Sequence, residues 1–433
     1  MKVRKRSFRI NSKAVKHSFS SKDLTSFGGL SMLSDFWSKH NIFDLFKNNF
    51  GQRNSNAQKF SLAQILMLLS SSAFCGMNRL EKISRFSADP LVRYLFSLKE
   101  KISRQTITNQ LKNMHEEGTR NLEALLLKQN AKWLLKTKLG HIVFDADSTV
   151  KTVYGNQEGA EKGYNEYKRG AKSYHPLVMF VHEIKLLYHT KFRPGDSHTA
   201  NGIKELIAEA KGSLPKSVKN VTFRADYGFF SKSLIDYLEE IGWSYLIKVK
   251  LRGLDKLLRL QKYEITDEGI EVARFEHQGV KWDSPLQFHA VRWVDGYEIY
   301  EPTGDLIPVY KYSCYATNMA FNPENSHDFY KRRSISETWI EQVKSHVKAG
   351  STLTNSFWAN DVLWQLACFA YNSSICMRIN HLVHHEEHQT FVDWMVRIPA
   401  KLIRTARQLR LSFSEKYLYR RKWEEFYFFL NYN

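Results

Sequence analysis

The sequence has few cysteines and no long apolar run. Its four cysteines form no CxxC pair, so neither a disulfide framework nor a cysteine zinc site is expected. No uninterrupted apolar stretch reaches membrane-spanning length. The N-terminus MKVRKRSFRINSK lacks the apolar core of a signal peptide. These absences, with no internal repeat or low-complexity tract, favour a globular cytoplasmic protein with reduced thiols and no membrane partner.

Acidic residues are also scarce relative to basic ones. Among 433 residues there are 64 Lys and Arg against 44 Asp and Glu, a formal net charge of +20. Such an excess favours a polyanionic partner, because each phosphate contact releases counterions. Ribosomal and membrane-surface proteins are also basic, so charge alone does not identify nucleic acid. The 43% hydrophobic content suffices for a core in two or three domains.

The first third of the chain is expected to be helical. Residues 1–20 form a basic arm, which either follows DNA phosphates or is a solvated tail. The segment AQKFSLAQILMLLSSSAF has a wide apolar face and no strand alternation. Ser103 can cap the helix SRQTITNQLKNMH, which carries Arg104 and Lys112. That helix suits either a groove-contacting helix-turn-helix or an ordinary bundle, so residues 21–138 are a candidate DNA-binding domain.

From residue 139 onward, strands alternate with helices. The order β-β-β-α-β-α-β over 139–251 predicts a mixed α/β layer. Residues 252–320 are mostly β, with a turn expected at Asp295-Gly296. Residues 321–380 return to helix and complete the α/β domain. Residues 381–433 are basic, rich in aromatics and expected to be helical.

Two aspartates each end an apolar strand. Asp147 ends HIVFDAD and Asp226 ends VTFRAD, and ligands of open α/β sheets bind at such carboxyl edges. Asp145 lies two residues before Asp147 and therefore points to the same side of its strand. An acid pair there is costly unless it is neutralised, although Asp147 could also simply cap a turn.

A helical segment supplies a third acid. At about 100° per residue, Tyr330, Arg333, Glu337 and Lys344 fall within an arc of about 60° and share one face of a helix. A carboxylate flanked by cations could hold a metal ion while the cations contact phosphates. The alternative is a solvated, salt-bridged face. Glu341 lies on the same face and competes with Glu337.

The ordered set of motifs resembles a known family. Tyr330, Arg333, Glu337 and Lys344 have the spacing of the YREK signature of the insertion-sequence-four group of bacterial DDE transposases. Further strings resemble the branch of insertion sequence thirteen-eighty. They are SRFSADPLVRYL, SRQTITNQL, DADSTV, YGNQEGAEKGYNEYKRGAKSYHPL, FRPGDSH, FRADYGFF and ISETWIEQVK. The similarity covers roughly residues 75–380. It departs where Thr338 and Trp339 replace residues that are polar in relatives.

The resemblance implies a ribonuclease-H-like core with a β-rich insertion at 252–320, and this agrees with the longer interval between Asp226 and Glu337. It implies that Asp147, Asp226 and Glu337 are catalytic and hold Mg²⁺ or Mn²⁺. Tyr330, Arg333 and Lys344 then contact phosphates. It also implies double-stranded DNA as partner, a homodimer in the DNA complex, and a location in the bacterial cytoplasm with the nucleoid.

Several residues have secondary candidate roles. Relatives hold a flipped base with a Trp of the insertion, for which Trp293 and Trp282 are candidates, although both could be core aromatics. Lys168, Arg169 and Lys172 lie in KRGAKSYHP, a DNA-contacting or plain basic loop. His175 and His198 could assist at the site. The histidines of HLVHHEEH (381–388) have spacings that suit zinc on a helix or a surface cluster.

The resemblance therefore implies a cut-and-paste transposase that hydrolyses phosphodiesters at terminal inverted repeats and joins the 3′-hydroxyl to target DNA. One rival is a DNA-binding regulator that no longer cuts. Another is a non-transposing nuclease with the same core.

Overall fold

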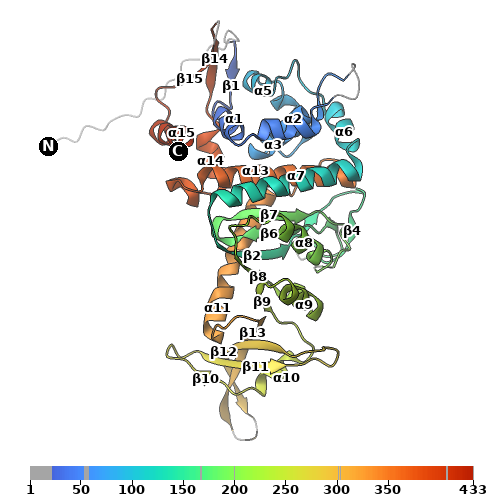
Figure 1. Cartoon of the computed structure of the whole chain (residues 1–433), viewed down its shortest axis with the longest axis vertical. Helices are drawn as coiled ribbons and strands as arrows, with labels where there is room; N and C mark the ends of the chain where they lie inside the picture. The colour runs from blue at the N-terminus through green and yellow to red at the C-terminus, as the bar shows by residue number, and fades with distance from the viewer. Residues whose placement is uncertain are drawn as a thin grey trace, which may run out of the picture.

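The computed structural model describes residues 22–52, 58–165, 168–198, 200–300, 302, 304–405 and 408–432. The basic arm expected at 1–20 lies outside these residues. A helical layer occupies one end of the molecule, a large mixed sheet runs through the middle, and a β-rich extension forms the other end (Figure 1). The fold is thus mixed α/β, as expected. In the part of the chain that is described, no helix is long and apolar enough to cross a membrane.

The N-terminal region is helical, as predicted. Ser61 and Gln64 form a capping box that fixes the start of α3, and Ser103 caps α6 through the Thr106 amide. The long helices α3 and α7 both pack on the buried helix α13 (Phe357–Arg378). The elements are β1 (Leu24–Thr25), α1 (Leu30–Lys39), α2 (Ile42–Phe50), α3 (Leu62–Phe74), α4 (Leu80–Phe86), α5 (Pro90–Leu95), α6 (Arg104–Lys112) and α7 (His115–Lys136).

A nine-stranded sheet forms the centre of the molecule, in the order β10-β11-β12-β13-β9-β8-β2-β6-β7. Strands β2, β8 and β9 run parallel, and the other neighbours are antiparallel. The first strands of the sheet are β2 (His141–Ser148), β6 (Leu177–Val181), β7 (Leu186–Lys191), β8 (Asn220–Ala225) and β9 (Ser244–Lys248). Helices α8 (Ile203–Ser213) and α9 (Lys232–Glu240) follow β7 and β8. The expected strand and helix order is confirmed here.

A small second sheet was not predicted. Strands β3 (Lys151–Thr152), β4 (Glu161–Lys162) and β5 (Lys172–Tyr174) pair in the order β3-β5-β4 between β2 and β6. Strands of two or three residues are too short for an alternating pattern, so the sequence shows only a loop here.

The β-rich segment extends the central sheet instead of forming a sheet of its own. It contains α10 (Leu254–Arg259), β10 (Glu264–Ile265), β11 (Glu271–His277), β12 (Leu286–Tyr300) and β13 (Asp305–Thr317), and β13 pairs with β9. The turn expected at Asp295-Gly296 is wrong. These residues form a bulge within the continuous strand β12, where the register shifts between Val294 and Gly296.

The helix carrying Glu337 is not continuous, which corrects the single helical face predicted from spacing. It consists of α11 (Pro323–Lys331), the 3-10 turn η3 (Arg332–Ser334), α12 (Ile335–Glu341) and the π-helical turn η4 (Gln342–His346). Such segments change the rotation per residue, so the arc calculated for a regular helix does not apply. Trp339, which departs from the family pattern, is buried against Phe180 and His182.

The C-terminal segment is only partly helical, contrary to expectation. After the 3-10 turn η5 (Leu382–His385) and α14 (His388–Met395), β14 (Ala400–Arg404) and β15 (Leu409–Phe413) form a hairpin. The hairpin pairs with β1, so the two ends of the described chain meet in one three-stranded sheet. Helix α15 (Arg420–Tyr432) follows.

Candidate active site

Two of the predicted acids lie side by side at the carboxyl edge of the sheet. Strands β2 and β8 are parallel neighbours in register from His141 opposite Asn220 to Ala146 opposite Ala225. The next residues are Asp147 and Asp226, so both carboxylates reach the same edge. Asp226 also caps the 3-10 turn η2 (Tyr227–Phe229) by accepting a hydrogen bond from the Gly228 amide at 3.0 Å.

Glu337 on α12 joins these aspartates in one groove. The groove has a volume of about 930 Å³ and is lined by polar residues from strands, loops and the helical segment. Its lining residues are Asp147, Ser148, Thr149, Val150, Tyr164, His175, Asp196, Ser197, His198, Asp226, Tyr227, Lys250, Arg333, Glu337, Ile340, Glu341 and Lys344. The structure therefore brings the three predicted acids and Lys344 together.

Arg333 connects the helical segment to β2. Its Nη2 lies 2.8 Å from Asp147 Oδ2 and donates to the Ala146 carbonyl at 3.2 Å. The guanidinium is buried, and its Nε makes no hydrogen bond within the described chain. Tyr330 packs on Tyr315 with ring centroids 4.7 Å apart, and burial raises the pKa of its hydroxyl to about 12. It is therefore a neutral hydrogen-bonding group at physiological pH.

The pKa of Asp147 is shifted mainly by burial and further by its charged neighbours. Burial raises the pKa of Asp147 from 3.8 to about 6, Arg333 opposes this rise, and the nearby Asp226 and Glu337 add to it. Buried acids that lie close together ionise less readily, and cations are needed to neutralise their charge. Such a site is therefore a candidate functional site.

The neighbouring acids Asp145 and Glu341 have different surroundings. Asp145 is buried, and Arg224 donates to both of its carboxylate oxygens, at 2.6 and 2.9 Å. His182 Nδ1 lies 2.8 Å from Asp145 Oδ2. Asp145 therefore belongs to a closed structural ion pair and does not line the groove. Glu341 does line the groove, but it is exposed and accepts a hydrogen bond from Ser345 one turn later.

The donor set fits a hard divalent cation. Three carboxylates from separate elements face one groove, and Mg²⁺ and Mn²⁺ prefer carboxylate oxygen ligands. In the described part of the chain, the ligand atoms of one other group, Glu123, His189 and Glu209, lie within 4.8 Å of one another.

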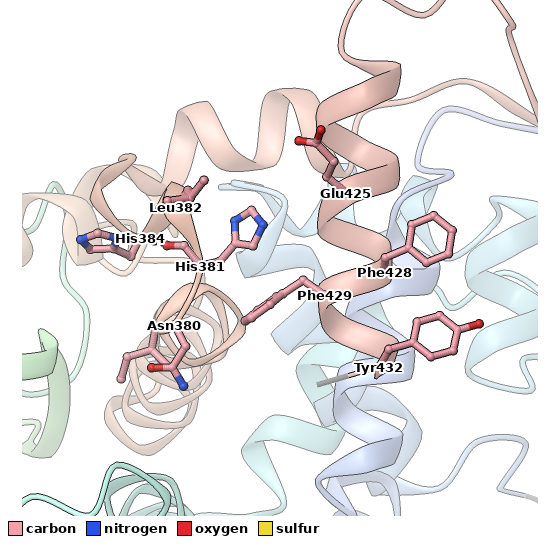
Figure 2. Close-up of a pocket in the computed structure, with 9 residues that line it drawn as sticks. Asn380, His381, Leu382, His384, Glu425, Phe428, Phe429 and Tyr432 are labelled. Carbon is pink, nitrogen blue, oxygen red and sulfur yellow. Dashed lines mark hydrogen bonds between the residues drawn. The ribbon is translucent and has the colours of Figure 1, made fainter.

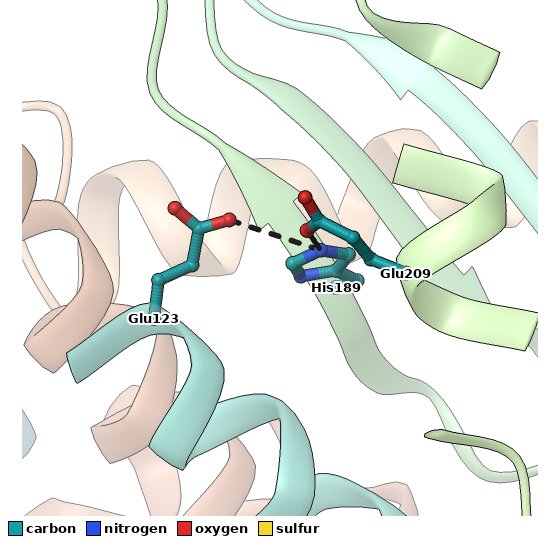
Figure 3. Close-up of side chains that lie close together, drawn as sticks. All are labelled: Glu123, His189 and Glu209. Carbon is teal, nitrogen blue, oxygen red and sulfur yellow. Dashed lines mark hydrogen bonds and ion pairs between the residues drawn. The ribbon is translucent and has the colours of Figure 1, made fainter. Parts of the chain in front are cut away.

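The cluster of Glu123, His189 and Glu209 joins α7, β7 and α8 (Figure 3). His189 Nε2 lies 2.7 Å from Glu209 Oε2. The Lys191 ammonium lies 2.5 Å from Glu123 Oε1 and 2.7 Å from Glu209 Oε2. Arg120 Nη1 lies 2.7 Å from Glu123 Oε2, so two side-chain cations, Lys191 and Arg120, balance the two carboxylates of this internal charge network.

The other predicted DNA-contacting residues lie at several places. Lys168 stacks on Tyr154 with its ammonium 4.9 Å from the ring, and Arg169 is exposed beside it. Lys172 begins β5 and donates to Asn156 at 3.3 Å. Arg104, 3.4 Å from Glu81, lines a separate groove of about 730 Å³ at the start of α6. Lys112 ends α6 and is exposed.

The two candidate tryptophans differ in exposure. Trp293 is 41% exposed and lies against His327 of α11, with ring centroids 6.0 Å apart. Trp282 is half-buried and packs on Phe230, His277 and Phe288. Neither lines the groove of the three acids.

The histidines of 381–388 do not form one helical cluster, which corrects the zinc alternative. His381 precedes η5 and packs on Phe426 and Phe429 of α15, and it lines an apolar groove with Leu382, Phe428 and Tyr432 (Figure 2). His388 is buried, its Nε2 lies 2.8 Å from the Phe74 carbonyl, and burial lowers its pKa to about 3. His175 and His198, by contrast, do line the groove of the three acids.

Lys250 is a groove residue that the sequence reasoning missed. It follows β9, the third parallel strand, and its ammonium lies 5.0 Å from the Tyr227 ring. Since β9 is parallel to β8, its carboxyl end meets the same edge of the sheet. The WSYLIKVK strand could therefore have indicated this cation.

Comparison with known proteins adds one extended match. A family model described as Transposase DDE domain group 1 matches residues 8–430. No curated protein matches the sequence. The chain is similar to a solved piggyBac transposase synaptic complex with hairpin DNA, with 13% identity and a TM-score of 0.48 over 87% of this chain and 82% of that one. It is also similar to the Mos1 mariner paired end complex with Mn, with 16% identity and a TM-score of 0.18, over 45% of this chain and 60% of that chain.

Proposed function

Because this chain belongs to the family of transposases defined by the group 1 DDE domain, we propose that it cleaves DNA at transposon ends and joins the freed 3′-hydroxyl to target DNA. The observation that carries this proposal is the single groove into which Asp147, Asp226 and Glu337 converge from two strands and a helix. The motif resemblance further supports membership in the insertion-sequence-four group, its thirteen-eighty branch, with the YREK residues Tyr330, Arg333, Glu337 and Lys344.

We propose a ribonuclease-H-like core for residues 139–251 and 321–380. The strand order β7-β6-β2-β8-β9, in which β6 alone runs antiparallel to β2, supports it. The extension at 252–320 would be the β-rich insertion of the family. Residues 21–138 would bind DNA through α6. Residues 381–433 would form a basic C-terminal region at the same end of the molecule as the N-terminal helices.

Asp147, Asp226 and Glu337 would hold Mg²⁺ or Mn²⁺. The bound cations would supply charge neutralisation at the phosphate and at the attacking and departing oxygens. The protein's own contribution is positioning, because strands and a packed helix hold the three carboxylates on rigid mounts.

The groove cations would bind and orient the DNA backbone. Arg333 has a buried Nε that makes no hydrogen bond within the described chain, and Lys250 and Lys344 line the same groove. An attacking water or 3′-hydroxyl approaches the phosphorus in line, a new P–O bond forms, and the P–O3′ bond of the cut strand breaks. We propose that further contacts along the duplex are made by Lys168, Arg169, Lys172, Lys112, Arg104 and Trp293. A homodimer would hold the two ends.

The test is end cleavage by the purified chain on a duplex carrying the inverted repeat that flanks its coding frame. We expect Mg²⁺-dependent cleavage, abolished by EDTA, followed by joining of the 3′ end to a target plasmid. Binding without cleavage would identify a DNA-binding regulator. Cleavage without joining would identify a nuclease. Either result would overturn the proposal.

A further inference from the structure

The hairpin formed by β14 and β15 carries cations and no acid. Residues 400–413 contain four bases, which are Lys401, Arg404, Arg407 and Arg410. Lys401, Arg404 and Arg410 are exposed, and none of the three forms an ion pair within the described chain. Cations that lie nearby in the sequence behave differently, because each is paired with an acid four residues away. They are Arg397, Arg420 and Arg421.

The strand register brings two of these cations to one face of the hairpin. Lys401 lies opposite Ser412, and Ile403 lies opposite Arg410, so the four side chains share a face. All four are exposed, whereas Leu402 on the other face is buried. The face of Lys401, Ile403, Arg410 and Ser412, here called the hairpin face, therefore points to solvent.

Protection of a sheet edge does not account for these charges. Lysines on edge strands block pairing with other chains, and β15 is an edge strand in the order β1-β14-β15. Lys401, however, lies on the central strand β14, where it is paired with Leu24 of β1. Like charges that are kept together without acids repel one another, and a bound polyanion relieves this repulsion.

The basic arm precedes the strand that pairs with this hairpin. Residues 1–21 contain seven Lys and Arg and no acid, and they lead to β1, which pairs with β14. The arm and the hairpin thus supply eleven positive charges and no negative one, in a chain whose formal net charge is +20. The hairpin lies at the helical end of the molecule, across the helical layer from the central sheet (Figure 1).

The partner that fits a basic two-stranded element is a nucleic-acid duplex. The major groove of B-DNA is about 12 Å wide and accepts a two-stranded β-ribbon, and the phosphates along the groove bind Lys and Arg. The choice of DNA among polyanions rests on the proposed function. We propose that the hairpin face is an additional duplex-binding surface, separate from the catalytic groove, where Lys401 and Arg410 bind phosphates of DNA that lies away from the cut.

A matched pair of double variants tests the proposal by binding alone. Lys401→Gln with Arg410→Gln removes two unpaired cations from the hairpin face. Arg420→Gln with Arg421→Gln removes two cations of α15 that are paired with acids. The salt dependence of binding to a long arbitrary duplex is measured in EDTA by fluorescence anisotropy, between about 50 and 200 mM salt.

The hairpin variant should show a log–log slope that is shallower by about 2 than that of the unaltered chain, and the α15 variant should show no change. Equal slopes for the two double variants would overturn the proposal. Because the measurement requires neither metal nor cleavage, its failure refutes the hairpin surface alone, and failure of the end-cleavage test leaves it standing.

A cross-linking experiment identifies the bound polyanion directly. Ile403→Cys labelled with a benzophenone maleimide should cross-link to duplex DNA above the background set by the labelled unaltered chain. Leu382→Cys is the control, because this 84% exposed position lines the apolar groove at the same end of the molecule, and it should cross-link much less. Equal cross-linking by the two cysteine variants would contradict the proposal. So would binding to anionic phospholipid vesicles that Lys401→Gln with Arg410→Gln weakens while duplex binding is unchanged.

Discussion

At the scale of residues, the site depends on which acid is neutralised by which cation. Asp145 and Asp147 lie two residues apart on one strand. Asp145 is buried and paired with Arg224, whereas Asp147 lines the groove. The sequence places both acids at the end of the strand but does not show which of the two belongs to the active site. The partner of each comes from an element distant in sequence, and only the packing of the fold shows it.

The ionisation of Asp147 gives a stability prediction. Its pKa is raised to about 6 in the folded chain, so the folded state retains the proton more strongly than the unfolded state does. The stabilisation from this proton is complete below about pH 4 and is lost as pH rises through about 6. In EDTA at pH 8, Asp147→Asn should therefore be more stable than the unaltered chain by about 1–3 kcal/mol.

Urea unfolding at pH 4.5, 6 and 8 measures this difference, which should shrink toward the lowest pH. Glu341→Gln, which removes an exposed groove carboxylate, is the control and should show no comparable gain at pH 8. Lower stability of Asp147→Asn at every pH would contradict the raised pKa of the buried Asp147 carboxyl.

At the scale of elements, strong local patterns were predicted well and irregular ones were not. Strands β2 and β8 were predicted because an apolar run ends in an acid, and α6 because Ser103 caps it. The bulge at Asp295-Gly296 was mistaken for a turn, because the same dipeptide serves both. The hairpin β14–β15 was mistaken for helix, since its stabilising partner β1 lies near the other end of the chain.

The small sheet β3-β5-β4 gives an element-scale prediction through Gly195 of the FRPGDSH string. A Cβ at this position would lie 1.9 Å from the Ser173 carbonyl oxygen and 2.4 Å from that of Glu161. Gly195→Ala should therefore displace the loop that carries Asp196 and His198 into the groove and destabilise the chain by about 1–3 kcal/mol.

Thermal unfolding checks this cost. Gly212→Ala in α8 is the matched control, because a Cβ there meets nothing within 4 Å, and it should be neutral or stabilising by about 0.5–1 kcal/mol. Equal melting temperatures for the two alanine variants would show that the close approach at Gly195 is not a constraint.

At the scale of the whole molecule, the central sheet lies between a helical end and the β-rich extension (Figure 1), and the groove is lined by residues at the carboxyl edge of that sheet. A net charge of +20 predicts non-specific duplex binding that is dominated by phosphate contacts. If about six phosphates are neutralised, affinity should fall about 10³-fold between 50 and 200 mM salt, a log–log slope of about −5.

Fluorescence anisotropy on an arbitrary duplex measures this slope. Arg169→Ala should make it shallower by about 1, whereas Arg421→Ala, which removes an exposed cation paired with Glu425 on α15, should leave it unchanged. A slope shallower than about −2 for the unaltered chain would contradict an extended phosphate interface.

The central claim is that Asp147, Asp226 and Glu337 together perform strand cleavage. The most direct measurement compares Mg²⁺-dependent cleavage of the inverted-repeat duplex by Glu337→Gln and Glu341→Gln, two equal changes one helical turn apart in the same groove. We predict a loss of at least about 10³-fold for Glu337→Gln, as for Asp147→Asn and Asp226→Asn, while Glu341→Gln stays within about tenfold of the unaltered chain. Near-unaltered cleavage by Glu337→Gln, or a larger loss in Glu341→Gln, would contradict the assignment.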